Sequence, residues 1–180
     1  MQRTLWKLCA MQKAFYNMKK IIVIGCPGSG KSRLSSELHK ITGLPLFHLD
    51  NLFWNEDKTT VERAVFDQKL SEILKKPQWI IDGNYSRTME QRLRECDTVI
   101  FLDFERDICL RGIEERKGKT RPDMPWVEQG DVDPEFLEFI KNFNQNCRPD
   151  IINLLSKHTE IQVFTLKNRA EADEFINKLK

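Results

Sequence analysis

A glycine-rich segment that ends in lysine and serine carries the clearest chemical signature in the sequence. Residues 25–32 read GCPGSGKS and match the pattern G-x-x-x-x-G-K-[ST]. A bound polyphosphate needs several backbone N–H groups converging on it, and the three glycines keep Cβ atoms out of their way. Lys31 is expected to bridge the β- and γ-phosphates, and the Ser32 hydroxyl to ligate Mg²⁺. We therefore predict a site for ATP and Mg²⁺, against the alternative of a tight glycine turn. The predicted nucleotide-binding residues are Gly25, Gly28, Ser29, Gly30, Lys31, Ser32 and Arg33.

A second acidic signal follows the short apolar run at residues 79–81. Asp82 would stand at the end of a buried strand, where a carboxylate can hold the water shell of Mg²⁺, directly or through Ser32. Because Asp-Gly is a common turn dipeptide, a turn or helix-capping role is the alternative. The predicted metal site is therefore Ser32 with Asp82.

A third candidate, Asp50, follows the apolar run at residues 46–49. A carboxylate there can accept a hydrogen bond from an acceptor hydroxyl and act as its base; a helix cap or turn is the alternative. His48 alternates with Asp50 along the expected strand and would face the same side, although a lone histidine is more often a packed polar group. A phosphate acceptor would need arginines, and only Arg63 lies between Asp50 and Trp79.

Residues 117–133 form a long stretch without periodicity that holds two glycines and two prolines. Such a stretch is usually a functional lid or a linker. Arg116 and Arg121 are candidates for mobile cations that close over the charge of a transferring phosphoryl group. The alternative is a solvated basic helix end, which we prefer for Arg111. Arg148 is a further candidate lid-side cation.

The surrounding sequence alternates short apolar runs with segments of helical period. This alternation predicts an α/β fold in which a parallel sheet is covered on both faces. Strands are expected at 21–24, 46–49, 79–81, 98–102 and 161–166, and helices at 31–41, 61–76, 86–95, 107–116, from 134 onward, and at 170–179.

Composition narrows the classes of protein. The chain has 180 residues, 40% of them hydrophobic and 31% charged, with a net charge of +2. No run approaches the roughly 20 apolar residues of a membrane span, and no basic stripe favours nucleic acid. Five scattered cysteines argue against a disulfide framework or a zinc site and favour a reducing cytoplasm. We expect residues 1–17, which are basic and free of acids, to be an N-terminal extension, disordered or not native, before a domain at 18–180; a targeting or partner-binding segment is the alternative.

These motifs resemble those of the adenylate-kinase-like P-loop kinases. In that family a strand ends in D-G-F-P-R-T; here residues 82–88 read DGNYSRT, one residue longer and without the proline. The chain is more closely similar to bacterial proteins described as topology modulation or adenylate-kinase-related proteins. The matching stretches are IIVIGCPGSGKS, LPLFHLDNLFW, WIIDGNYSRT and ERKGKTRPDMPW. The resemblance covers Met18 to the end of the chain.

The resemblance implies a three-layer P-loop NTPase fold of the nucleoside-monophosphate-kinase type, with a five-stranded parallel sheet in the order 2-3-1-4-5 and a lid at about 117–133. It implies that Arg87 sits near the acceptor. Shikimate- and gluconate-type kinases, which this segment also resembles, have an acid at the position of Asp50. The G-D-M-L-R run of typical adenylate kinases is absent, which argues against AMP as the acceptor. The catalytic residues we predict are Lys31, Asp50, Arg87, Arg116 and Arg121.

The predicted function is ATP- and Mg²⁺-dependent phosphoryl transfer to a small-molecule or nucleotide acceptor. A nucleotide-binding regulator that acts on a partner or DNA, and a simple NTPase with water as acceptor, are the alternatives. We expect a monomer or a homodimer, with no membrane and no nucleic-acid partner.

Overall fold

A computed structural model describes residues 18–127 and 130–180. The predicted extension at 1–17 and part of the predicted lid, residues 128–129, lie outside the described residues. The strands are β1 (Lys20–Gly25), β2 (Leu46–His48), β3 (Trp79–Asp82), β4 (Thr98–Leu102) and β5 (Gln162–Leu166). The helices are α2 (Lys31–Thr42), α3 (Leu49–Phe53), α4 (Arg63–Leu74), α5 (Met89–Leu93), α6 (Arg106–Arg116), α7 (Pro134–Asn146), α8 (Arg148–Leu155) and α9 (Arg169–Asn177), with a 3₁₀ turn η1 at Ser86–Thr88.

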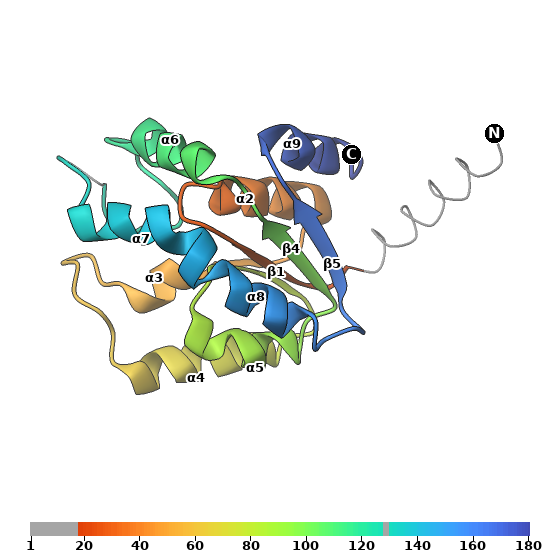
Figure 1. The fold of residues 1–180 in the computed structure, drawn as a ribbon. Helices are drawn as coiled ribbons and strands as arrows, with labels where there is room; N and C mark the ends of the chain where they lie inside the picture. Colours follow the sequence, from red (N-terminus) through yellow and green to blue (C-terminus); the bar gives the residue numbers. More distant parts are fainter. Residues whose placement is uncertain (1–17, 128–129) are drawn as a thin grey trace, which may run out of the picture.

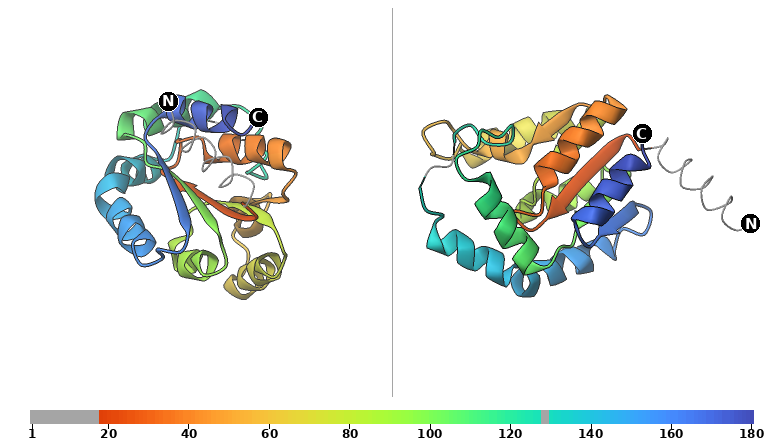
Figure 2. Two further views of the ribbon diagram at one scale, coloured as in Figure 1. Left: turned by 90° about the vertical axis from the view of Figure 1, so that its right-hand side faces the viewer. Right: turned by 90° about the horizontal axis from the view of Figure 1, so that it is seen from above.

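The five strands form one parallel sheet in the order β2-β3-β1-β4-β5, which confirms the predicted order. Helices α2 and α9 cover one face, and α4, α5 and α8 cover the other (Figures 1 and 2). Strand β1 lies at the centre, where the side chains of Ile21, Ile22, Val23 and Ile24 are fully buried. A strand enclosed on both faces must be apolar throughout, which explains its unbroken aliphatic run.

The predicted strands agree with the structure to within a residue or so, and the helices differ more. The segment predicted as one helix at 86–95 is the turn η1 followed by the short helix α5. The strand predicted at 46–49 ends at His48, and Leu49 begins helix α3, which was not predicted. Both differences fall where chain segments leave the carboxyl edge of the sheet, and tertiary contacts set the backbone there.

No helix within 18–127 and 130–180 has the length and apolar character needed to cross a membrane.

Candidate active site

The glycine-rich loop joins the end of β1, at Gly25, to the start of α2, at Lys31. Gly30 has a φ of 94° immediately before the helix, a left-handed conformation that favours glycine. The Lys31 ammonium donates a hydrogen bond of 3.2 Å to the Cys26 carbonyl, so the side chain folds over the loop. The 12-residue helix α2 directs the positive end of its dipole at the loop. Together these features make a local geometry suited to an anion.

The loop packs directly against the backbone of α6. A Cβ atom on Gly28 would lie 2.1 Å from the carbonyl oxygen of Cys109, and Gly28 has a φ of 82°. A Cβ atom on Gly112, one helical turn further, would lie 2.0 Å from the carbonyl oxygen of Gly28. The helix therefore fixes the height of the loop above the sheet, and only glycine fits at the two facing positions.

A side-chain amide holds the other side of the loop. The Gly25 N–H donates to Asn84 Oδ1 at 3.0 Å, and Asn84 Nδ2 donates to the Gly25 carbonyl at 2.8 Å. Asn84 follows β3, so this pair of bonds joins the segment after β3 to the end of β1. The neighbouring Tyr85 has a φ of 38°, which is uncommon for a residue with a side chain and marks a strained turn.

A fully buried arginine supports this turn. Arg92 of α5 is 0% exposed and donates to the carbonyls of Gly83 (2.9 Å), Asn84 and Tyr85 (3.1 Å). Burial lowers the pKa of Arg92. Sequence reasoning missed this residue, because an arginine in a short amphipathic segment is normally a surface residue. Its bonds to main-chain carbonyls leave no trace in the sequence pattern.

Asp82 lies at the carboxyl end of β3, in register with His48 of β2 and Val23 of β1. Its Oδ2 atom is 2.8 Å from His48 Nδ1, whereas Oδ1, also buried, has no hydrogen-bond partner among the described residues. Burial by itself lowers the pKa of His48, but the Asp82 hydrogen bond and the surrounding carboxylates raise it above its ordinary value. The histidine is thus a packed partner of the predicted metal-binding carboxylate.

Asp50 lies in the first turn of α3 and not in a strand, so the prediction that it shares a strand face with His48 is wrong. The chain turns after His48, and the two side chains find different partners. Asp50 Oδ1 accepts a hydrogen bond of 2.7 Å from the Tyr85 hydroxyl. Burial raises the pKa of Asp50, the Tyr85 bond and the charge of Lys31 oppose this, and two further carboxylates add to it. These interactions bring Asp50 into the same electrostatic environment as the lysine of the loop.

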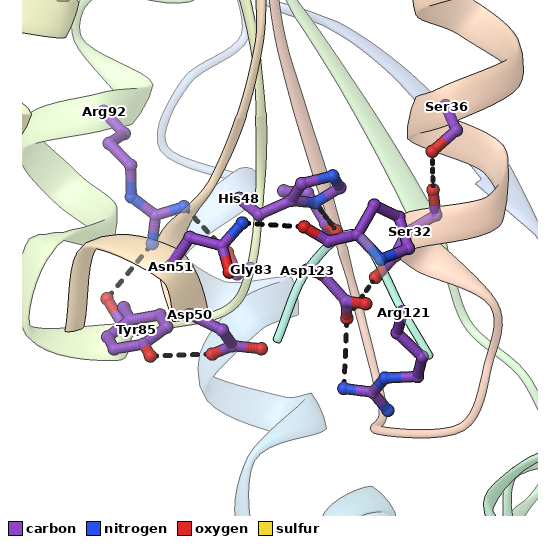
Figure 3. A network of polar contacts seen from close by, with 12 residues as sticks. Ser32, Ser36, His48, Asp50, Asn51, Gly83, Tyr85, Arg92, Arg121 and Asp123 are labelled. Atoms are coloured by element: carbon purple, nitrogen blue, oxygen red, sulfur yellow. Dashed lines mark hydrogen bonds and ion pairs between the residues drawn. The ribbon is translucent and has the colours of Figure 1, made fainter. Parts of the chain in front are cut away.

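The segment predicted as a lid contributes a carboxylate that sequence reasoning missed. Asp123 Oδ2 accepts a hydrogen bond of 2.7 Å from the Ser32 hydroxyl and lies 3.3 Å from the Arg121 guanidinium (Figure 3). Asn51 of α3 donates to the Pro122 carbonyl at 2.7 Å. The signal that could have found Asp123 is its position two residues after Arg121, in the middle of the lid.

Aromatic rings line the space between α3, α4 and the lid segment. Phe53 makes edge contacts with Trp54 and Tyr85, at centroid distances of 5.0 and 5.3 Å. Tyr85 stacks on Phe66 at 5.3 Å, and Trp54 meets Trp126 of the lid segment at 5.6 Å. Phe53 and Trp54 follow one another at the end of α3. They are only partly buried, so they can serve both as anchors and as a wall.

Arg87, predicted near the acceptor, is engaged by a carboxylate of α4. Its two terminal nitrogens lie 2.5 and 3.0 Å from the oxygens of Asp67, and its guanidinium lies over the Phe66 ring. Arg63 is 4.0 Å from the same carboxylate. Two arginines therefore share one aspartate on this side of the site.

The remaining predicted cations each contact a different part of the chain. Arg116 lies over the ring of Phe136 in α7, at 5.8 Å from its centroid. Arg33 is exposed and pairs with Asp173 of α9 at 2.7 Å. Arg148 pairs through two bonds, of 2.6 and 2.8 Å, with Asp103 at the end of β4, and Lys167 binds the same carboxylate. These bonds give Asp103 a structural role and make Arg148 part of that cluster and not a free lid-side cation.

The residues around Ser32 fit a magnesium ion whose coordination shell is completed by the phosphates of a nucleotide. Within the described ranges, no three His, Cys, Asp or Glu side chains are placed to hold a metal by themselves. Mg²⁺, however, usually takes one or two protein oxygens and fills its shell with phosphate oxygens and water. The buried Oδ1 of Asp82, which has no partner in the described part of the chain, and the Ser32 hydroxyl are oxygen ligands of the required kind.

Comparisons with known proteins agree with this architecture. No family model matches the sequence. Adenylate kinase from Thermotoga petrophila is 23% identical over 151 residues, which cover 83% of this chain but only 59% of that protein. Shikimate kinase from Bacteroides thetaiotaomicron superposes with a TM-score of 0.53 and 18% identity, over 90% of this chain and 96% of that one. Shikimate kinase from Acinetobacter baumannii, solved in complex with shikimate, gives a TM-score of 0.55 and 14% identity, over 93% of each chain.

At these identities the structural likenesses show the fold alone, which is that of small P-loop kinases. The sequence match to adenylate kinase is weak, and this chain spans only 59% of the length of that protein. Neither comparison bears on the topology modulation description.

Proposed function

We propose that this protein transfers the γ-phosphoryl group of Mg²⁺-bound ATP to a hydroxyl group of a small-molecule acceptor. The observation that carries the proposal is the partly buried carboxylate of Asp50, hydrogen-bonded by Tyr85 and influenced by the charge of Lys31. A carboxylate with a raised pKa, held close to a phosphate-binding loop, is what deprotonation of an attacking hydroxyl requires.

The chain's own groups would divide the work as follows. Backbone N–H groups of residues 25–32 and the start of α2 would hold the phosphates, with Lys31 along the transferring group. Ser32 and Asp82 would hold Mg²⁺, which supplies charge neutralisation on the phosphate oxygens. Arg121 would bring positive charge from the lid, and Asp50 would accept the proton of the acceptor hydroxyl. Most of the acceleration would come from positioning and electrostatics.

The arginines favour a hydroxyl acceptor over a phosphate acceptor. Gripping a monophosphate would require free guanidinium groups, but Arg87 binds Asp67 through two bonds and Arg63 lies near the same carboxylate. The aromatic rings beside Asp50 suit an acceptor with a ring or an apolar body. A protein that only binds or hydrolyses ATP would leave the paired Asp50 and Tyr85 without a purpose.

The test is ADP production from Mg²⁺ and ATP with a panel of acceptors: nucleosides, shikimate, gluconate, other sugar acids, and nucleoside monophosphates. Wild type is compared with Lys31→Ala and Asp50→Asn, and Asp57→Asn, an exposed loop residue, is the matched control. We expect stimulation by a hydroxyl compound that falls by about 100- to 10,000-fold in Asp50→Asn. Lys31→Ala should abolish it, and Asp57→Asn should retain it.

Two outcomes would contradict the proposal. Stimulation by a nucleoside monophosphate that survives Asp50→Asn would move the acceptor site to Arg87 and Arg63. Tight ATP binding with no stimulation by any acceptor would favour the regulator hypothesis.

A further inference from the structure

The lid segment contacts the phosphate-binding loop through the buried carboxylate of Asp123, whose two oxygens have very different surroundings. Asp123 is 7% exposed, and one of its oxygens, Oδ2, serves both Ser32 and Arg121. Its other oxygen, Oδ1, is buried and has no hydrogen-bond partner within the described part of the chain. A buried carboxylate oxygen without a partner is costly, so such atoms call for an explanation.

Asp82 shows the same pattern from the opposite side. It is 4% exposed, its Oδ2 is bound by His48, and its Oδ1 is also buried, with no hydrogen-bond partner among residues 18–127 and 130–180. The charges of both aspartates act on His48 and on Asp50, which places them in one small region. One of these two buried carboxylates, Asp123, thus binds the hydroxyl that the sequence motif assigns to Mg²⁺, and the other acts on the same neighbouring groups.

We propose that Asp123 is a lid-borne member of the Mg²⁺ site, which binds the ion or its water shell through Oδ1 together with Ser32 and Asp82. The inference rests on the proposed function, because nucleotide phosphates must complete the shell of the ion. It assigns the metal a second role, which is to hold the lid in place.

Contacts on either side of Asp123 indicate which part of the site the bound ion would stabilise. The lid segment is bound to α3 through the hydrogen bond from Asn51 to the Pro122 carbonyl and through the contact between Trp54 and Trp126. Asp123 lies between these two anchors in the sequence. An ion that binds Asp123 would therefore add to the two contacts that hold the lid segment against α3 and would further stabilise the wall beside Asp50.

The test measures metal binding without turnover. Mn²⁺ affinity is determined by electron paramagnetic resonance in the presence of a non-hydrolysable ATP analogue, for wild type, Asp123→Asn, Asp123→Glu and the exposed lid control Asp131→Asn. Asparagine keeps the size of the side chain but removes the charge. We expect Asp123→Asn to weaken Mn²⁺ binding about 10- to 100-fold, Asp123→Glu to restore part of it, and Asp131→Asn to match wild type. Affinity for the analogue without metal should not fall in any variant, and urea unfolding checks that each variant is folded.

Equal or tighter Mn²⁺ binding in Asp123→Asn would overturn the inference, because the carboxylate would then only block the site before nucleotide enters. In that case wild type would still bind the metal–nucleotide complex, and the proposed function would stand. Failure of wild type to bind the complex at all would overturn both.

Discussion

The contact between Gly28 and Gly112 gives a prediction in which two physical effects oppose each other. Gly112 lies within helix α6, where alanine is favoured over glycine by about 1 kcal/mol. Helix propensity alone therefore predicts that Gly112→Ala stabilises the protein. The new Cβ atom, however, would lie 2.0 Å from the Gly28 carbonyl oxygen and 2.9 Å from its carbonyl carbon.

The size of the change in stability depends on which atoms must move to relieve this contact. Both partners are backbone, so no side chain can rotate away, and the loop must shift by about 1 Å to reach a tolerable contact. Overpacking of this kind costs about 1–3 kcal/mol, and we expect the upper end. After the gain in propensity, Gly112→Ala should lower the free energy of unfolding by about 1–2 kcal/mol. A displaced phosphate loop should also lower phosphoryl transfer about 100-fold.

Urea unfolding measures the loss of stability, and the rate of ADP production together with titration with ATP measures the effect on the loop. Gln91→Ala, at an exposed position of α5, is the control and should change stability by less than about 0.5 kcal/mol. A Gly112→Ala protein as stable as wild type or more so, with unchanged ATP affinity, would refute the reasoning. It would mean that helix and loop can separate without cost.

Three further predictions concern buried charge. Arg92→Met should lower the free energy of unfolding by about 3–5 kcal/mol in urea denaturation, because it removes the side-chain donor from the carbonyls of Gly83 and Asn84; a loss below about 1 kcal/mol would show that water replaces it. In a pH profile of kcat/KM, the acid limb should lie above the ordinary aspartate value of about 3.9, because burial raises the pKa of Asp50, and it should vanish in Asp50→Asn. The ion pair of His48 with Asp82 should add stability that is complete below about pH 6.5 and lost as pH rises through the higher pKa of the folded state. Unfolding measured between about pH 6 and 9 should therefore show a slope that His48→Gln removes, and an unchanged slope would contradict the assignment.

The parts of this molecule that could be predicted from sequence are those whose signals are local. The buried strand at residues 21–24 is a continuous aliphatic run, and the glycine-rich loop between β1 and α2 is a fixed pattern of eight residues. The strand order followed from the family resemblance, because the residues themselves predicted only a parallel sheet. Asp50 and Asp82 stood out because acids at the ends of apolar runs are rare enough to notice.

The parts that could not be predicted depend on contacts between distant segments. Asp123 lies 91 residues from the hydroxyl that it binds, so no spacing rule connects the two. Arg92 is buried because three carbonyls converge on it, which is a property of the turn and not of the helix pattern. Helix α3 has five residues, too few to show a period, and its presence moves Asp50 out of the strand.

The paired hydrogen bonds between Asn84 and Gly25 have a mechanical consequence. The Asn84 amide binds both the N–H and the carbonyl of one residue, Gly25, as a neighbouring strand would, so it joins the end of β1 rigidly to the turn after β3. The phosphoryl donor and the phosphoryl acceptor would then bind to two segments whose spacing stays constant through each turnover. Asn84→Ala would remove both hydrogen bonds, so the end of β1 and the turn after β3 could move independently. Each substrate would still bind, but the two would be misaligned, and the rate of transfer would fall.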